Sequence, residues 1–188
     1  MLHILVELNI PALLLAKVLQ SEQQTGLVKV LSYPEPSSMT GSAKGFLAVR
    51  REPVAVVQNA ESTYPRTAAR IRQGIEEVMG DIIWRAPFRI LIAVPAVEAL
   101  LFRRPNAIAR AYGPVSEHLL KVGLISPRDA LMKLDPNIST DQISLNIIKE
   151  LDDADIAALR AESPVRELLE FVEELQRDGV LAAAAVGP

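Results

Sequence analysis

Pro53-Val54-Ala55-Val56-Val57-Gln58 is the clearest buried strand in the sequence, because valine favours strands and this run carries three of them. The polar turn Asn59-Ala60-Glu61-Ser62-Thr63 follows it, and Ser62 or Thr63 can cap the next helix. That helix is predicted from Pro65 to Met79, where Gly80 gives a common left-handed end. The rest of the fold can be built outward from this strand, turn and helix.

Three more strands are expected around this unit, with helices between them. The expected strands are 2–6, 27–31 and 88–94, and the expected helices are 11–24, 43–51 and 97–102. Residues 33–42 are rich in Pro, Ser and Gly and are predicted to be a loop. Strands that alternate with helices pair in parallel, because parallel neighbours need a crossover connection. The sequence therefore predicts an α/β fold with a small, mainly parallel sheet flanked by helices.

From residue 106 the pattern becomes helical throughout. Ser126-Pro127-Arg128-Asp129 is a good helix start, and Ser163-Pro164 begins another. We expect two parts, an α/β core over residues 1–105 and a helical extension over 106–188 that packs on it. The alanine-rich end, from Leu181 to Pro188, is expected to fray.

The composition limits the expected cellular compartment and the kinds of chemical site that the chain can form. The chain has no cysteine, which excludes disulfides, thiolate metal sites and cysteine nucleophiles. No basic segment precedes the first apolar run, and every apolar run is too short to span a bilayer. A protein of the cytoplasm with no membrane contact is the expectation. The net charge of -3 gives no general attraction to nucleic acid.

Potential oxygen ligands follow three of the predicted strands. Glu7 ends the first strand, Asn59 and Glu61 follow the valine-rich strand, and Glu98 lies shortly after the 88–94 strand. Carboxyl ends of parallel strands meet at one edge of a sheet, where ligands of open α/β sheets bind. Carboxylates at that edge could hold Mg²⁺.

Three short motifs carry a resemblance to a known family. Ile4-Leu5-Val6-Glu7, Asn59-Ala60-Glu61-Ser62 and Pro95-Ala96-Val97-Glu98 resemble the acidic motifs of Toprim domains, which topoisomerases, primases and OLD-type nucleases share. The resemblance covers roughly residues 1–105. It implies catalytic roles for Glu7, Glu61 and Glu98, and a Mg²⁺ site made by Glu7, Asn59 and Glu61. It also implies that Arg66 and Arg70, on the helix after the acidic turn, contact nucleic acid.

The sequence departs from the family pattern at Leu8, Asn59 and Glu61, where the family has Gly, Asp and Asp. The resemblance therefore implies a nuclease-like protein that acts on or binds nucleic acid, with catalysis that is reduced or lost. Whether it is an enzyme, a Mg²⁺-dependent phosphodiesterase, stays open. The alternative is a catalytically silent module that binds a partner protein or forms a homodimer.

Each site residue also has an ordinary structural interpretation. Glu7 can be a solvated charge at a strand end, and Asn59 can serve the local turn. Glu98 can be a first-turn acid favoured by the helix dipole. Arg66 and Arg70 can be part of a solvated helix face. His3, inside an apolar strand, is predicted to be a packed residue.

Overall fold

The computed structural model describes residues 1–181 of the chain, so the alanine-rich end from residue 182 lies outside the described residues. Its centre is a four-stranded sheet in the order β2-β1-β3-β4. The strands are β1 (Leu2–Glu7), β2 (Val28–Tyr33), β3 (Val54–Asn59) and β4 (Phe88–Ala93). Every neighbouring pair is parallel. The predicted α/β fold is confirmed, and all four strands lie where the sequence placed them.

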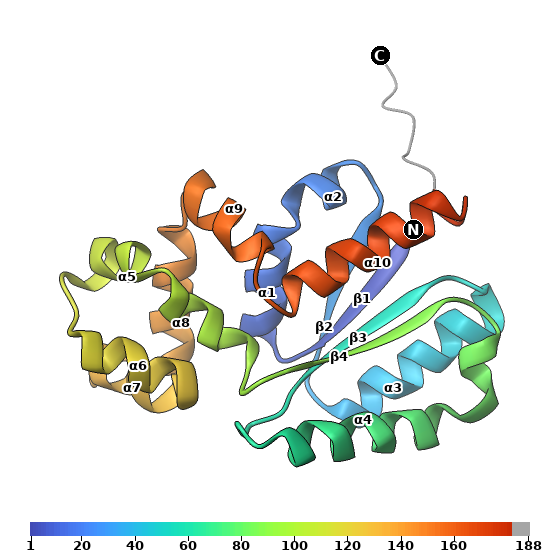
Figure 1. The fold of residues 1–188 in the computed structure, drawn as a ribbon, viewed down its shortest axis with the longest axis horizontal. Helices are drawn as coiled ribbons and strands as arrows, with labels where there is room; N and C mark the ends of the chain where they lie inside the picture. The colour runs from blue at the N-terminus through green and yellow to red at the C-terminus, as the bar shows by residue number, and fades with distance from the viewer. Residues whose placement is uncertain (182–188) are drawn as a thin grey trace.

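Helices cover both faces of the sheet (Figure 1). One face carries α3 (Pro36–Gly45), the π-helix η1 (Phe46–Arg50), α4 (Pro65–Met79) and the 3-10 helix η2 (Gly80–Trp84). The other face carries α1 (Asn9–Val18), α2 (Gln20–Gln24) and α10 (Val165–Arg177). Side chains alternate across a strand. Ile4 and Val6 of β1 therefore enter the larger core under α1, whereas Leu5 enters the smaller core over α3 and α4.

The loop predicted over residues 33–42 is wrong, because α3 begins at Pro36 within it. Its serines and glycine are weak helix formers, which is why the sequence indicated a loop. Proline is tolerated in the first helical turn, and Met39, Thr40 and Ala43 are buried against the sheet. Packing of this face therefore outweighs the low helix propensity.

The predicted cap of α4 is also wrong, although the helix has the predicted bounds. Its N-cap residue is Tyr64, and no side-chain hydrogen bond caps the first turn. The Ser62 hydroxyl instead accepts a hydrogen bond from the Tyr64 N–H, at 3.1 Å. Ser62 thus shapes the turn between β3 and α4.

The chain after β4 is helical, as predicted. Its elements are the 3-10 helix η3 (Val97–Arg103), α5 (Pro105–Tyr112), α6 (Glu117–Ile125), α7 (Pro127–Leu134), α8 (Thr140–Lys149), α9 (Asp153–Arg160) and finally α10. Helices α5 to α8 gather at the left of Figure 1, α9 returns to lie beside α1, and α10 returns over the sheet. The division at residue 105 stays a prediction.

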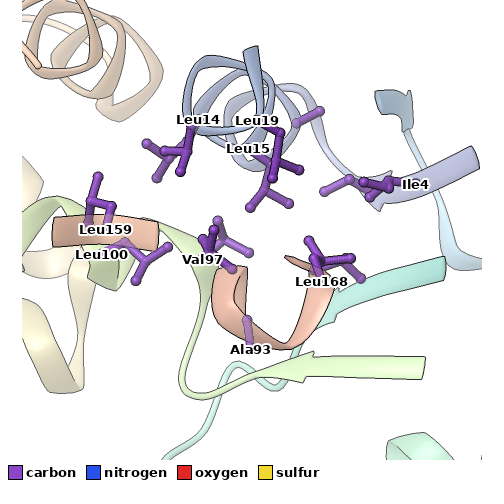
Figure 2. Close-up of a cluster of buried hydrophobic side chains, with 14 of the residues drawn as sticks. Ile4, Leu14, Leu15, Leu19, Ala93, Val97, Leu100, Leu159 and Leu168 are labelled. Atoms are coloured by element: carbon purple, nitrogen blue, oxygen red, sulfur yellow. The ribbon is translucent and has the colours of Figure 1, made fainter. Parts of the chain in front are cut away.

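Apolar contacts join the returning helices to the sheet. Figure 2 shows Ile4 of β1, Leu15 of α1, Val97 of η3 and Leu168 of α10 in one buried cluster. Burying each such side chain contributes about 1.5–3 kcal/mol relative to leaving it exposed. The Arg160 guanidinium also reaches the Glu22 carboxylate at 2.5 Å, which fastens α9 to α2. Within residues 1–181, no helix has the length and apolar character needed to cross a bilayer.

Candidate functional site at the carboxyl edge of the sheet

The predicted site residues lie at the carboxyl edge of the parallel sheet. Glu7 is the last residue of β1, and Asn59 is the last residue of β3, where it pairs with Ala93 of β4. Glu61 follows two residues after Asn59, and Glu98 lies in the first turn of η3. We call these four residues the rim. The parallel topology brings them together from segments that are far apart in the sequence.

Asn59 is a buried tether between β3 and η3. Its amide oxygen accepts a hydrogen bond from the Val97 N–H at 2.9 Å, and its amide nitrogen donates to a Glu98 carboxylate oxygen at 3.2 Å. The residue is only 6% exposed. Because both ends of the amide are used within the protein, Asn59 fixes the position of Glu98.

Glu61 is held by its backbone, and its side chain is exposed. Its N–H donates to the Pro95 carbonyl, and the preceding Ala60 N–H donates to the Ala93 carbonyl, each at 2.8 Å. Glu61 has a φ of 52°, in the left-handed region that non-glycine residues rarely adopt. The turn thus directs a carboxylate outward at the cost of local backbone strain.

Leu8 carries a second strained backbone beside Glu7. Its φ is 69° and its ψ is 158°, a conformation that glycine adopts far more readily. The Leu8 N–H donates to the Tyr33 carbonyl at 2.8 Å, which extends the pairing of β1 with β2 past Glu7. The backbone therefore makes the turn for which the Toprim pattern has glycine, although leucine occupies the position.

Burial and the nearby charge of Glu61 raise the pKa values of Glu7 and Glu98. Burial raises the pKa of Glu7, and the negative charge of Glu61 raises it further. Burial is also the main reason that the pKa of Glu98 is raised, and the charges of Glu61 and Asp141 add to it. Hydrogen bonds from Asn59 and from the backbone of Glu98 oppose this increase. Glu7, Glu61 and Glu98 form no ion pair within residues 1–181.

The helical extension closes one side of the rim. A pocket of about 180 Å³ lies between Glu61 and Glu98 on one wall and the starts of α7 and α8 on the other. The far wall contributes Arg128, Thr140, Asp141 and Ser144. Ser144 is almost completely buried. The sequence analysis did not identify these four residues. Their only signal in the sequence is their position near two helix starts.

Arg66 and Arg70 are exposed on α4, one turn apart. Neither lines the rim pocket, and neither forms an ion pair in the described part of the chain. Arg72 differs, because its guanidinium donates to the Ile90 carbonyl of β4 at 2.8 Å. Arg66 and Arg70 are therefore free to contact a ligand from outside the pocket, and Arg72 is committed to the fold.

Some of the oxygen atoms at the rim suit a hard cation such as Mg²⁺, and others do not. Among residues 1–181, no three Asp, Glu, His or Cys side chains are arranged to hold a metal ion together. Glu7 and Glu61 offer carboxylate oxygens, and Mg²⁺ is often held by one or two carboxylates while it keeps several waters. The oxygen of Asn59 is occupied by Val97. The rim thus fits a carboxylate pair better than the predicted set of three ligands.

Together, the parallel sheet, the acidic carboxyl edge and the flanking helices define a Toprim-like fold. The chain is similar in structure to the C-terminal region of the Burkholderia pseudomallei OLD protein, with a TM-score of 0.62 and 17% identity. The likeness covers 96% of this chain and 98% of that chain, so it includes the helical extension. No known protein family matches the sequence, and neither does any curated protein.

Proposed function

We propose that this protein is a nuclease-like enzyme that binds nucleic acid at the rim and hydrolyses phosphodiester bonds slowly, with Mg²⁺ as its metal. The observation that supports the proposal is that Glu61 lies close enough to both Glu7 and Glu98 to raise the pKa of each, while none of the three forms an ion pair within residues 1–181. Like charges gathered without compensation cost stability, and such arrangements are typical of functional sites. The fold shared with an OLD protein agrees with this chemistry. The cytoplasmic location expected from the sequence is part of the proposal.

Glu7 and Glu61 would hold Mg²⁺, and water would complete the shell of the ion. When bound, the ion would acidify a water and neutralise phosphate charge. Glu98, fixed by Asn59, would orient the attacking water and accept its proton. The water oxygen would bond to phosphorus, and the bond from phosphorus to the leaving sugar oxygen would break as that oxygen takes a proton from solvent.

Cationic side chains would position the phosphate backbone. Arg128 faces the pocket from α7, opposite the carboxylates. A guanidinium there can donate two hydrogen bonds to one phosphate. Arg66 and Arg70 would contact the strand outside the pocket, where phosphate contacts fix register without reading sequence. Asn59 in place of an acid leaves the site one charge short, which is why we expect slow turnover.

The test is cleavage of single-stranded DNA and plasmid DNA with and without Mg²⁺. We expect Glu61→Gln to lower the rate by about 100-fold or more, because even indirect support of a metal ligand is worth about 10–100-fold. Glu117→Gln, an exposed carboxylate on α6, is the matched control and should cleave like the unmodified protein. Cleavage that survives Glu61→Gln would remove the proposed site.

Metal binding gives a readout that does not depend on turnover. Titration with Mn²⁺ in a calorimeter should show binding to the unmodified protein and to Glu117→Gln. Glu7→Gln and Glu61→Gln should each lose most of the heat, because each removes one of the two carboxylates. Binding that is equal in all four proteins would place the metal elsewhere.

The buried tether at Asn59 favours a second candidate, a silent nucleic-acid-binding or protein-binding module. Its amide oxygen is bonded to Val97 and is withdrawn from any ligand. In this case DNA binding in the presence of a chelator should persist and should weaken in Arg66→Ala and Arg70→Ala. Neither Mg²⁺ nor Mn²⁺ would then produce cleavage.

A further inference from the structure

A groove lies between α3 and α4, on the face of the sheet opposite to α1 and α10. The two helices are in contact and run side by side in Figure 1, from the carboxyl edge of the sheet toward its amino edge. The groove has a volume of about 540 Å³, which is in the usual range of about 300–1,000 Å³ for sites of small ligands. It shares no lining residue with the rim pocket, so it is a separate feature of the molecule.

Two glycines in helix interiors leave this groove open. Gly41 of α3 and Gly74 of α4 both line it. Apart from its chain neighbours and the backbone of its own helix, a Cβ atom at either position would meet no heavy atom within 4 Å. Neither glycine has a positive φ. Packing and backbone conformation therefore do not require glycine at these positions, although glycine destabilises a helix interior relative to alanine. What the two positions share is the open space of the groove.

The walls of the groove are mainly apolar. Ile71, Ile75 and Val78 of α4 form one side, and Pro36 contributes to the side made by α3. Val78 is 52% exposed, which is unusual for a valine on a helix that packs against a sheet. An apolar ligand would remove these side chains from water, and that burial is favourable.

Two polar side chains in the groove have no protein partner. Lys44, in the last turn of α3, is the only charged residue of the described chain that lines the groove, and Gln58 reaches it from β3. Within residues 1–181, the side chains of Lys44 and Gln58 form neither a hydrogen bond nor an ion pair. Thr40 differs, because its hydroxyl donates to the Pro36 carbonyl of its own helix at 3.0 Å. The groove thus offers one free cation and one free amide beside an apolar wall.

We propose that the groove between α3 and α4 binds a small organic anion with an apolar body, of the kind represented by an aromatic carboxylate. The anionic group pairs with the Lys44 ammonium, and the apolar body lies over Gly41 and Gly74 against the isoleucines of α4. The Gln58 amide can donate to or accept from a second polar atom of the ligand. The single positive charge selects an anion, and the volume of the groove suits a small molecule better than a protein surface, which needs a much larger contact area.

Nuclear magnetic resonance of the isotope-labelled full chain tests the site with naphthoate, an aromatic carboxylate, as the probe. The amide signals of Gly41 and Gly74 should shift and reach saturation, whereas those of Gly113 and Gly179, which lie outside the groove, should stay unchanged. Groove signals that do not shift, or neutral naphthylmethanol that binds as tightly as naphthoate, would overturn the proposal. Shifts at Gly41 and Gly74 caused by protein concentration alone would mean that a second copy covers the groove, and they would overturn it as well.

Removal of the lysine charge tests the anion. Lys44→Met should raise the dissociation constant of naphthoate at least about 10-fold, because a hydrogen bond to a charged group is commonly worth that factor. Lys17→Met is the matched control, because Lys17 occupies the same place in the last turn of α1, another helix of ten residues. It should bind naphthoate like the unmodified protein. Equal affinity in Lys44→Met and Lys17→Met would exclude Lys44 as the anion partner.

Filling the groove tests its location. Gly74→Leu places a side chain in the open space and should abolish naphthoate binding, while the temperature of unfolding should not fall, because no neighbouring atom obstructs the new Cβ. Ala69→Leu adds the same side chain to the exposed part of α4 outside the groove and should leave binding unchanged. Naphthoate that still binds to a folded Gly74→Leu variant would place the ligand elsewhere and overturn the proposal. The rim plays no part in these tests, so their result is separate from that of the cleavage assay.

Discussion

The two ends of the sheet differ in how their ionisable side chains are arranged. At the carboxyl edge, Glu61 repels both Glu7 and Glu98, and none of the three has an ion-pair partner within residues 1–181. At the amino edge, His3 of β1 lies 2.8 Å from a Glu52 carboxylate oxygen and stacks on the Phe46 ring. The same parallel strands thus carry a repulsive cluster at one end and a paired, packed cluster at the other.

This contrast distinguishes features that stabilise the fold from features that stability does not explain. Pairing at the amino edge is what stability alone would favour, whereas the crowding of acids at the carboxyl edge opposes stability. Of the three non-glycine residues with positive φ in residues 1–181, Leu8 and Glu61 lie at this same edge, and Arg51 lies at the amino edge, just before β3. Stability alone gives no reason for these features, whereas ligand binding at the rim would supply one.

Removal of the Asn59 tether should have the largest effect. Asn59→Ala leaves the Val97 N–H without its partner in a buried place and frees the Glu98 carboxylate. We expect it to lower the free energy of unfolding by about 3 kcal/mol, because buried unsatisfied groups cost about 1–3 kcal/mol each. Urea denaturation measures the loss.

Asn146→Ala is the matched control for this variant. Asn146 also donates an amide hydrogen bond, but to the neutral Tyr112 hydroxyl at 2.9 Å. Its loss should be about 1 kcal/mol, the usual value for a neutral hydrogen bond. Equal losses in the two variants would mean that the hydrogen bonds of Asn59 contribute no more to the free energy of unfolding than an ordinary side-chain hydrogen bond. The contrast between the two edges would then weaken.

Much of this arrangement could be predicted from the sequence, because it depends on local patterns. The alternation of apolar runs with helical segments predicts the parallel sheet. Parallel strands in turn bring Glu7 and Glu61 to the same edge. The bounds of α4 also follow from local signals, with Pro65 at its start and Gly80 after its end. These features need no knowledge of distant contacts.

The remaining features depend on packing between distant segments. Arg128 and Asp141 reach the pocket only because α7 and α8 fold back toward the strand ends, and no local pattern encodes that return. The use of the Asn59 amide likewise depends on Val97, which lies in another element. α3 was missed for the same reason, since its buried face rather than its composition makes it a helix.

Relief of strain at the rim should have the second largest effect. Leu8→Gly places a residue without a Cβ at a φ of 69°, which removes a strain of about 1–3 kcal/mol. The greater flexibility of glycine in the unfolded chain offsets about 0.5–1 kcal/mol of this gain in stability. We therefore expect a net gain of about 1 kcal/mol in the free energy of unfolding. Leu13→Gly, in the interior of α1, should instead lose about 1 kcal/mol or more.

Neutralising one rim carboxyl should have a smaller effect that depends on pH. Because the pKa of Glu98 is raised, the native state binds its proton more tightly than the unfolded chain does. Its charge therefore destabilises the fold above the raised pKa, and this penalty disappears as the pH falls toward the ordinary value of 4.5. Glu98→Gln should gain about 0.5–1 kcal/mol at neutral pH, the scale of a pairwise charge contact, and nothing in acid.

Thermal unfolding over a pH series measures this difference. Glu173→Gln, an exposed carboxylate on α10, is the control and should leave the stability unchanged at every pH. If Glu98→Gln lowers stability at neutral pH, burial and the charge of Glu61 do not penalise the Glu98 carboxylate as expected, and the functional interpretation of the rim loses its main support.

The amino edge should respond to pH in the opposite direction and by the smallest amount. Burial lowers the pKa of His3, although Glu52 opposes the change, while Lys29 and the N-terminal amine add to it. The native state therefore binds fewer protons than the unfolded chain, and stability falls as the pH drops below the ordinary value of 6.5.

His3→Leu removes this dependence and the buried Nδ1 atom, which has no hydrogen-bond partner among residues 1–181. Within the range from about pH 7.5 to about pH 5.5, where histidine titrates, we expect the variant to gain less than about 1 kcal/mol relative to the unmodified protein. Chemical denaturation at the two pH values checks it. A relative gain from His3→Leu that does not grow on acidification would mean that the two edges do not titrate in opposite senses.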